Sequence, residues 1–157
     1  MSQMQLPSGV NMNATDFSAV VTDTNGAPTT VIRKEQSFSI DCEWYLQGPD
    51  APNTGARWQV RVALESIGPG TDFVQTSPNS PIPYTNGILS GPAGNRRVTF
   101  TESVPLPNGL TLVPAGETER SYHVTALLTS RDQFNAAPTS YAAMYDLGVI
   151  TIFDSDL

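Results

Sequence analysis

Several residue types are scarce in this sequence, and each shortage excludes a class of protein. The 157 residues contain one cysteine, Cys42, and one histidine, His123. A single cysteine cannot form an internal disulfide, and transition-metal sites need clusters of such ligands. No segment reaches the roughly 18–20 apolar residues of a membrane-spanning helix. The sequence therefore predicts no disulfide framework, no transition-metal site and no membrane insertion.

Basic residues are also few. Lysine and arginine number 8 against 15 aspartates and glutamates, the formal net charge is −7, and Lys34 is the one lysine. Nucleic acids and anionic membranes both attract clusters of basic residues, so neither is an expected partner. Because lysine commonly protects sheet edges against pairing with another chain, its scarcity is compatible with assembly.

The N-terminal segment, residues 1–14, is polar and aperiodic. This pattern predicts a flexible arm, and docking of the arm on a neighbouring subunit is the alternative. The segment has neither a basic start nor an apolar stretch, so no secretory signal peptide is visible. The expected location is the cytoplasm, or a particle or surface structure reached without Sec export. Residues 15–157 are expected to form one domain.

Turn-forming residues and alternating apolar residues make up much of the remainder. The chain contains 12 glycines and 13 prolines, and only 15% of its residues are charged. Strict alternation over residues 36–46 and 57–66 predicts strands with one solvated face. Further strands are expected at residues 16–22, 29–33, 72–76, 96–103, 119–129 and 145–153.

Other segments follow different patterns. Residues 77–95 predict a loop with at most a short edge strand near Pro83-Tyr84, because proline cannot donate to a ladder. Residues 140–144 are the one plausible helix, and the apolar run from Val149 to Phe153 predicts a strand buried on both faces. The expected core comprises Phe38, Ile40, Cys42, Trp44, Trp58, Val60, Val62, Leu64, Val98, Phe100, Tyr122, Val124, Leu128, Val149 and Ile152.

Two local patterns resemble those of known domains. Cys42 on an early strand and Trp58 on the next are similar to the B-strand cysteine and C-strand tryptophan of immunoglobulin domains. The stretch Leu112-Val113-Pro114-Ala115-Gly116 before Tyr122 resembles the E–F corner of fibronectin type III domains. The resemblance implies that Tyr122 is the corner tyrosine, whose hydroxyl bonds to a backbone group upstream. The second immunoglobulin cysteine would fall at Val124, so the resemblance is to disulfide-free relatives.

This resemblance implies an all-β fold, an immunoglobulin-like antiparallel β-sandwich of 7–9 strands with long loops. It also implies binding, adhesion or assembly rather than one activity, because the fold supports many functions.

No arrangement of residues predicts an enzyme or a cofactor. His123 lies outward on its strand without a motif for a nucleophile, and Cys42 is expected to be buried and inert. Asp41 and Glu43 share a solvated strand face. Two carboxylates on such a face are usually ordinary surface residues rather than a catalytic pair. Asp154 and Asp156 could contribute to a calcium site, but a solvated acidic tail is the favoured interpretation.

The favoured function is a non-enzymatic structural or interaction module. It would form a homo-oligomer or dock into a larger protein assembly through sheet edges, the arm and the loops. The alternative is a carbohydrate- or small-ligand-binding module that uses loops 48–56, 77–95 and 130–144. The candidate interaction residues are Tyr45, Tyr84, Tyr141 and Tyr145.

Overall fold

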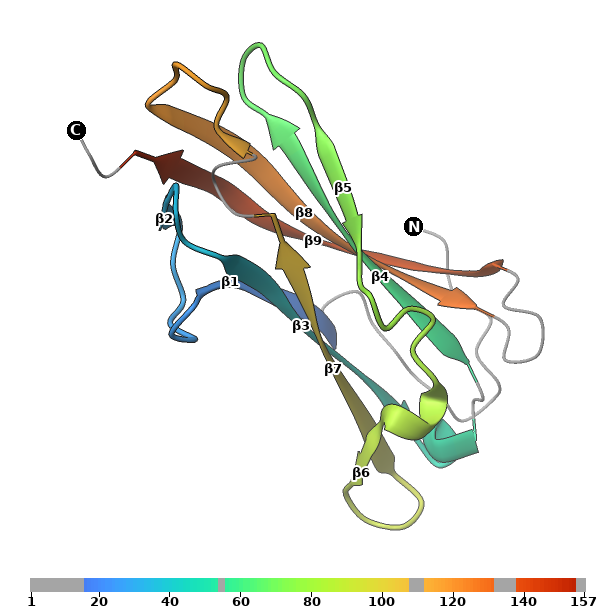
Figure 1. Cartoon of the computed structure of the whole chain (residues 1–157). Coiled ribbons are helices and arrows are strands. Elements are labelled where there is room, and N and C mark those ends of the chain that lie inside the picture. Colours follow the sequence, from blue (N-terminus) through green and yellow to red (C-terminus); the bar gives the residue numbers. More distant parts are fainter. Residues whose placement is uncertain (1–15, 54–55, 108–111, 132–137, 155–157) are drawn as a thin grey trace.

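A computed structural model describes residues 16–53, 56–107, 112–131 and 138–154, with the backbone alone at 138–141. Within these residues the chain forms nine strands in two sheets (Figure 1). The four-stranded sheet has the order β1 (Phe17–Asp23), β3 (Phe38–Gly48), β7 (Arg96–Leu106) and β6 (Ile88–Ser90). The five-stranded sheet has the order β2 (Val31–Arg33), β9 (Pro138–Phe153), β8 (Glu119–Arg131), β4 (Arg57–Ser66) and β5 (Phe73–Thr76). Two 3₁₀ turns cover Ala51–Asn53 and Tyr84–Asn86.

Alternating side chains place the core between the two sheets. The buried residues of β3 and β4 are the apolar ones that the two-residue period places on one face. Trp44 of the four-stranded sheet contacts Trp58 of the five-stranded sheet edge to face, with ring centroids 6.1 Å apart. Trp44 also stacks on Phe100 at 5.5 Å. Every residue of the expected core is buried except Val149.

The helix expected at residues 140–144 is wrong, because this segment belongs to β9. Strand β9 begins at Pro138, opposite Arg131, and pairs with β8 up to Phe153. A proline is tolerated at the first residue of a strand, where no ladder bond is required from it. The long neighbouring strand β8 provides backbone partners that a short isolated helix cannot match.

The expected short edge strand near Pro83-Tyr84 is also displaced. Tyr84 opens the 3₁₀ turn, and the short strand is β6, which pairs with β7. Ile82 forms an isolated bridge to Trp58 of the other sheet. Prolines at positions 81 and 83 leave few backbone donors for a ladder there.

Two further expectations about the sheets need correction. All strand pairs are antiparallel except β2 with β9, which are parallel. After β1 the chain crosses to the five-stranded sheet, where β2 lies beside β9 and runs in the same direction. Val149 is 49% exposed, so β9 is not buried on both faces: Ile150 and Ile152 point into the core and Val149 points outward.

The chain segment before β8 is held by Tyr122. Its buried hydroxyl donates a hydrogen bond of 2.5 Å to the carbonyl oxygen of Leu112. This is the contact that the resemblance to an E–F corner implied. Leu112 and Val113 are buried, so this part of the segment before β8 is fixed against the core.

Candidate interaction surface

The outer face of the five-stranded sheet carries exposed aliphatic side chains. Val31 of β2, Val149 and Met144 of β9, and Val74 of β5 point away from the core, and Ile67 follows β4 in register with this face. Each is between 49% and 66% exposed. Because side chains on one sheet face lie close to their cross-strand neighbours, Val31, Val149 and Ile67 form the apolar end of this face.

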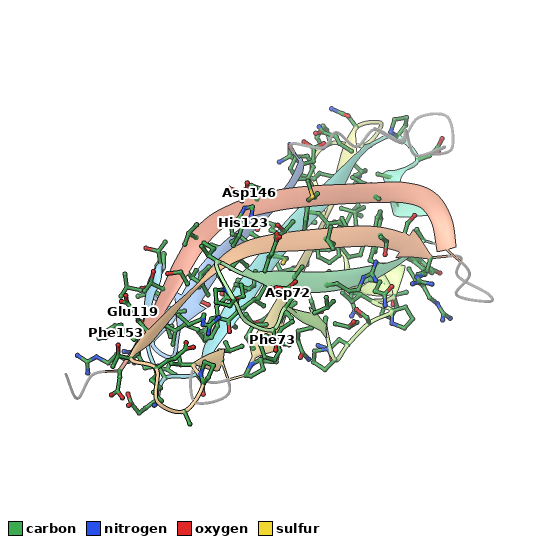
Figure 2. All side chains as sticks on the ribbon, turned by 90° about the horizontal axis from the view of Figure 1, so that it is seen from above. Asp72, Phe73, Glu119, His123, Asp146 and Phe153 are labelled. Carbon is green, nitrogen blue, oxygen red and sulfur yellow. The ribbon has the colours of Figure 1, made fainter. Side chains whose placement is uncertain are left out.

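His123 lies on β8, the central strand of the same face, between Glu65 of β4 and Asp146 of β9. Glu65 of β4 and Val149 of β9 are its register partners. Its Nε2 lies 2.7 Å from Oδ1 of Asp146, and Figure 2 shows these two side chains together on one side of the sheet. The pair is exposed, so it joins two strands at the surface and is not enclosed in a cleft.

A β-bulge in β9 brings Asp146 to His123. The register between β8 and β9 shifts at Val124 and Thr125, and Gly148 adopts a φ of +77°. The Gly148 N–H donates a 2.8 Å hydrogen bond to Oδ1 of Asp146. This bond and the one from His123 lower the pKa of Asp146, because both donors favour the charged carboxylate.

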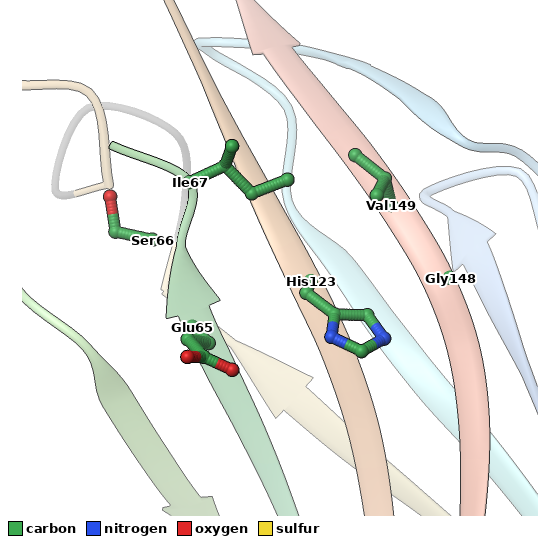
Figure 3. Close-up of a pocket in the computed structure, with 6 residues that line it drawn as sticks. All are labelled: Glu65, Ser66, Ile67, His123, Gly148 and Val149. Carbon is green, nitrogen blue, oxygen red and sulfur yellow. The ribbon is translucent and has the colours of Figure 1, made fainter.

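A groove of about 450 Å³ runs beside His123 (Figure 3). Its walls are the side chains of Glu65, Ile67, His123 and Val149, and Ser66 and Gly148 also line it. The groove combines two aliphatic walls with one carboxylate and one imidazole. Such a mixed, open surface suits contact with another protein, since interfaces combine apolar residues with a polar rim.

The outer face of the four-stranded sheet holds a larger groove of about 790 Å³. Two rows of outward side chains form its sides, Ser18–Glu43–Thr101 and Val20–Asp41–Ser103, each row crossing β1, β3 and β7. Tyr145 of β9 also lines it. The groove is acidic and rich in hydroxyl groups.

Asp41 is held within this groove by hydroxyl donors. Its carboxylate accepts hydrogen bonds from Thr22 at 3.0 Å, Ser39 at 3.2 Å and Ser103 at 2.8 Å. Glu43, two residues along the same strand face, is exposed. Among the described residues no hydrogen bond or ion pair joins Asp41 to Glu43, and both side chains lie on the outer sheet face.

Tyr45 lies on the same outer face of the four-stranded sheet, in a polar setting. The guanidinium carbon of Arg97 lies 4.0 Å above the centre of its ring, and Arg97 donates a 3.1 Å hydrogen bond to Gln47. A hydrogen bond with Asp16 raises the pKa of the Tyr45 hydroxyl. Tyr45 therefore has partners within the chain on both its ring face and its hydroxyl.

The other candidate tyrosines do not gather with Tyr45. Tyr84 and Tyr145 are each 38% exposed, but Tyr84 opens a 3₁₀ turn and Tyr145 lies on β9. The side chain of Tyr141 lies outside the described residues, and its backbone is strand rather than helix. Because residues 138–153 form a strand, Tyr141 and Tyr145 do not share the face of a helix. Tyr145 lines the large acidic groove, whereas Tyr45 and Tyr84 do not.

The sequence raised chemical roles for Cys42, Asp154 and Asp156. Cys42 is buried, and burial together with the charges of Asp41 and Glu102 raises its pKa to about 12. Asp154 forms an ion pair of 3.6 Å with Lys34, and Asp156 lies outside the described residues. In the part of the chain that the structure describes, no three acidic, histidine or cysteine side chains gather as metal ligands. No helix there is long and apolar enough to span a membrane.

Sequence reasoning missed the contact of His123 with Asp146, which are 23 positions apart. A local signal was present, because an isolated glycine within a strand pattern often marks a bulge. Gly148 is such a glycine.

Two solved structures are distantly similar to this chain. No family model matches the chain, and no curated protein matches its sequence. AggA, the major subunit of aggregative adherence fimbriae type I from Escherichia coli, has 11% identity and a TM-score of 0.36, covering 92% of this chain and 98% of that one. AvmM, which catalyses macrocyclization in alchivemycin A biosynthesis, has 11% identity and a TM-score of 0.30, covering 94% of this chain and 96% of that one. At these scores neither similarity assigns a function to this chain.

Proposed function

We propose that the chain is a disulfide-free, immunoglobulin-like β-sandwich. The order β1-β3-β7-β6 corresponds to strands A-B-E-D of that fold, and β9-β8-β4-β5 corresponds to G-F-C with an added C′ strand. The corner hydrogen bond from Tyr122 to Leu112 supports the same assignment. Trp58 then lies on strand C, where immunoglobulin domains carry their core tryptophan.

The function we propose is that of a non-enzymatic module that assembles with further copies of itself or docks into a larger protein assembly. The observation that carries this proposal is the exposed aliphatic set on the five-stranded sheet: Val31, Ile67, Val74, Met144 and Val149. A sheet face that is exposed to water usually carries polar side chains, which alternate along each strand with the apolar side chains of the buried face. Burying aliphatic surface stabilises an association by about 25 cal/mol per Å² before the costs of binding.

Light scattering across a concentration series tests this proposal. The wild-type chain is expected to exceed its monomer mass of 16.8 kDa as concentration rises. A Val31→Lys/Val149→Lys variant should remain near the monomer mass, because it places two charges at the apolar end of the face. Leu89→Lys is the matched control, since Leu89 is an exposed aliphatic residue on the other sheet and lies opposite the inward-facing Val98.

Two results would overturn the proposal. One is a wild-type chain that stays at the monomer mass at every concentration and does not bind a second protein through this face. The other is an assembly that persists unchanged in the Val31→Lys/Val149→Lys variant. The contribution of residues 2–14 is measured separately with a chain that lacks them and keeps every described residue.

A further inference from the structure

An arginine cluster lies on the outer face of the five-stranded sheet, at the end away from Val31. Arg57 of β4 is the register partner of Arg131 of β8, and Arg61 follows four residues later on β4. All three side chains are half-buried and point outward. Three of the chain's few basic residues thus share one end of one sheet face, although the net charge is −7.

Arg131 donates a hydrogen bond to Gln59 of β4 and so has a partner within the copy. Arg57 lies directly opposite Arg131, and like charges in that position destabilise a sheet. Arg57 and Arg61 form no ion pair within the described residues, and the Nε of Arg61 is buried there without a hydrogen-bond partner. Glu65 is the nearest carboxylate along β4, about 13 Å from Arg61 at the rise of a strand.

The opposite side of the domain carries the complementary charge. The groove on the four-stranded sheet contains Asp41 and Glu43, and the rows that hold them contain no basic residue. Glu43 is exposed and makes no ion pair within the described residues. Val20, which is 40% exposed, lines the same groove and provides an apolar contact for an approaching sheet face.

We infer that the occupant of the arginine end is a second copy of this chain. The arginine cluster of one copy binds the Asp41–Glu43 groove of the next, where guanidinium groups can form paired hydrogen bonds to carboxylates. The two surfaces lie on different sheets, so this contact is heterologous and each copy can bind two others. Such contacts build open chains unless the rotation closes a ring. This inference rests on the proposed assembly function and adds that the copies associate head to tail.

Charge exchange tests the inference with two variants of the full chain. One is Arg57→Glu/Arg61→Glu, and the other is Glu43→Arg; Asp41 is left intact because its hydrogen bonds hold three strands together. Each variant alone should associate roughly tenfold or more weakly than wild type, because like charges then face each other. Mixing them should restore association, since each variant supplies the charge that the other has lost. Circular dichroism confirms that both are folded.

The outcomes separate this inference from the assembly function itself. If Val31→Lys/Val149→Lys dissociates the assembly but neither charge variant does, the assembly function stands and the inference is wrong. If Arg57→Glu/Arg61→Glu weakens association but Glu43→Arg does not, the arginines bind a different anion and the inference is again wrong. A mixture that stays monomeric also overturns it, whereas weakening of wild-type association by salt supports it.

Discussion

The hydroxyl of Tyr122 donates a buried hydrogen bond of 2.5 Å to the carbonyl oxygen of Leu112, ten positions earlier in the chain. Burial raises the pKa of this hydroxyl, so it remains a donor under ordinary conditions. The bond holds Leu112 against β8 and satisfies a backbone acceptor that would otherwise be desolvated.

Removing this hydroxyl should destabilise the domain. We expect Tyr122→Phe to lower the free energy of unfolding by about 1 kcal/mol or more, because the Leu112 carbonyl loses its donor while the ring remains in place. Urea denaturation followed by tryptophan fluorescence measures the change. Tyr84→Phe, at an exposed ring, is the control and should match wild type. Equal stability of Tyr122→Phe and wild type would show that the bond contributes nothing.

The bulge at Gly148 should depend on glycine for conformational reasons alone. A Cβ at this position would meet no atom within 4 Å, but its φ is +77°. We therefore expect Gly148→Ala to cost about 1–2 kcal/mol of stability through left-handed backbone strain. Gly148→Asn should cost less, since asparagine adopts this conformation more readily. Thermal unfolding measures the stability of the two variants. Equal losses of stability in both would point to a cause other than backbone strain.

The carboxylate of Asp146 should titrate below its ordinary pKa of 3.8, because Gly148 and His123 donate to its charged form. A group with a lowered pKa stabilises the fold above its unfolded-state pKa, and this contribution is lost as the pH falls through the lowered value. NMR titration of the carboxyl carbon measures the midpoint. In His123→Gln the midpoint should shift upward toward 3.8, and a midpoint that is not lowered in wild type would contradict the bulge geometry.

The thiol of Cys42 should be unreactive in the folded protein. Burial, with the charges of Asp41 and Glu102, raises its pKa to about 12, so very little thiolate exists at pH 8. Iodoacetamide should modify Cys42 slowly in buffer and quickly in denaturant. Rapid modification under native conditions would mean that β3 opens locally far more often than a central, fully paired strand should.

Much of the fold could be predicted from local pattern. The two-residue alternation from Phe38 to Leu46 and from Trp58 to Leu64 specifies two strands and their inner faces, because one face of each must be buried. The turn before Tyr122 was equally informative, since its corner hydrogen bond depends on residues close together in sequence. The same alternation places Arg57 and Arg61 on the outer face of β4.

The start of β9 could not be predicted in this way. Residues 140–144 include the helix formers Ala142, Ala143 and Met144, but they form a strand because β8 presents a long row of backbone partners. Likewise, the contact of His123 with Asp146 depends on a register shift between two strands. Neither feature is local to one segment.

The sequence by itself determined an all-β chain, its strands and most of its core, because these follow from alternation, turn residues and the burial of apolar side chains. The tertiary structure alone decided which sheet each strand joins, that Val149 faces water, and that Arg57 lies opposite Arg131 while Asp41 and Glu43 lie on the other sheet. The physical reason is that strand pairing is a long-range interaction. The local sequence of a strand does not specify which other strand supplies its backbone hydrogen-bond partners.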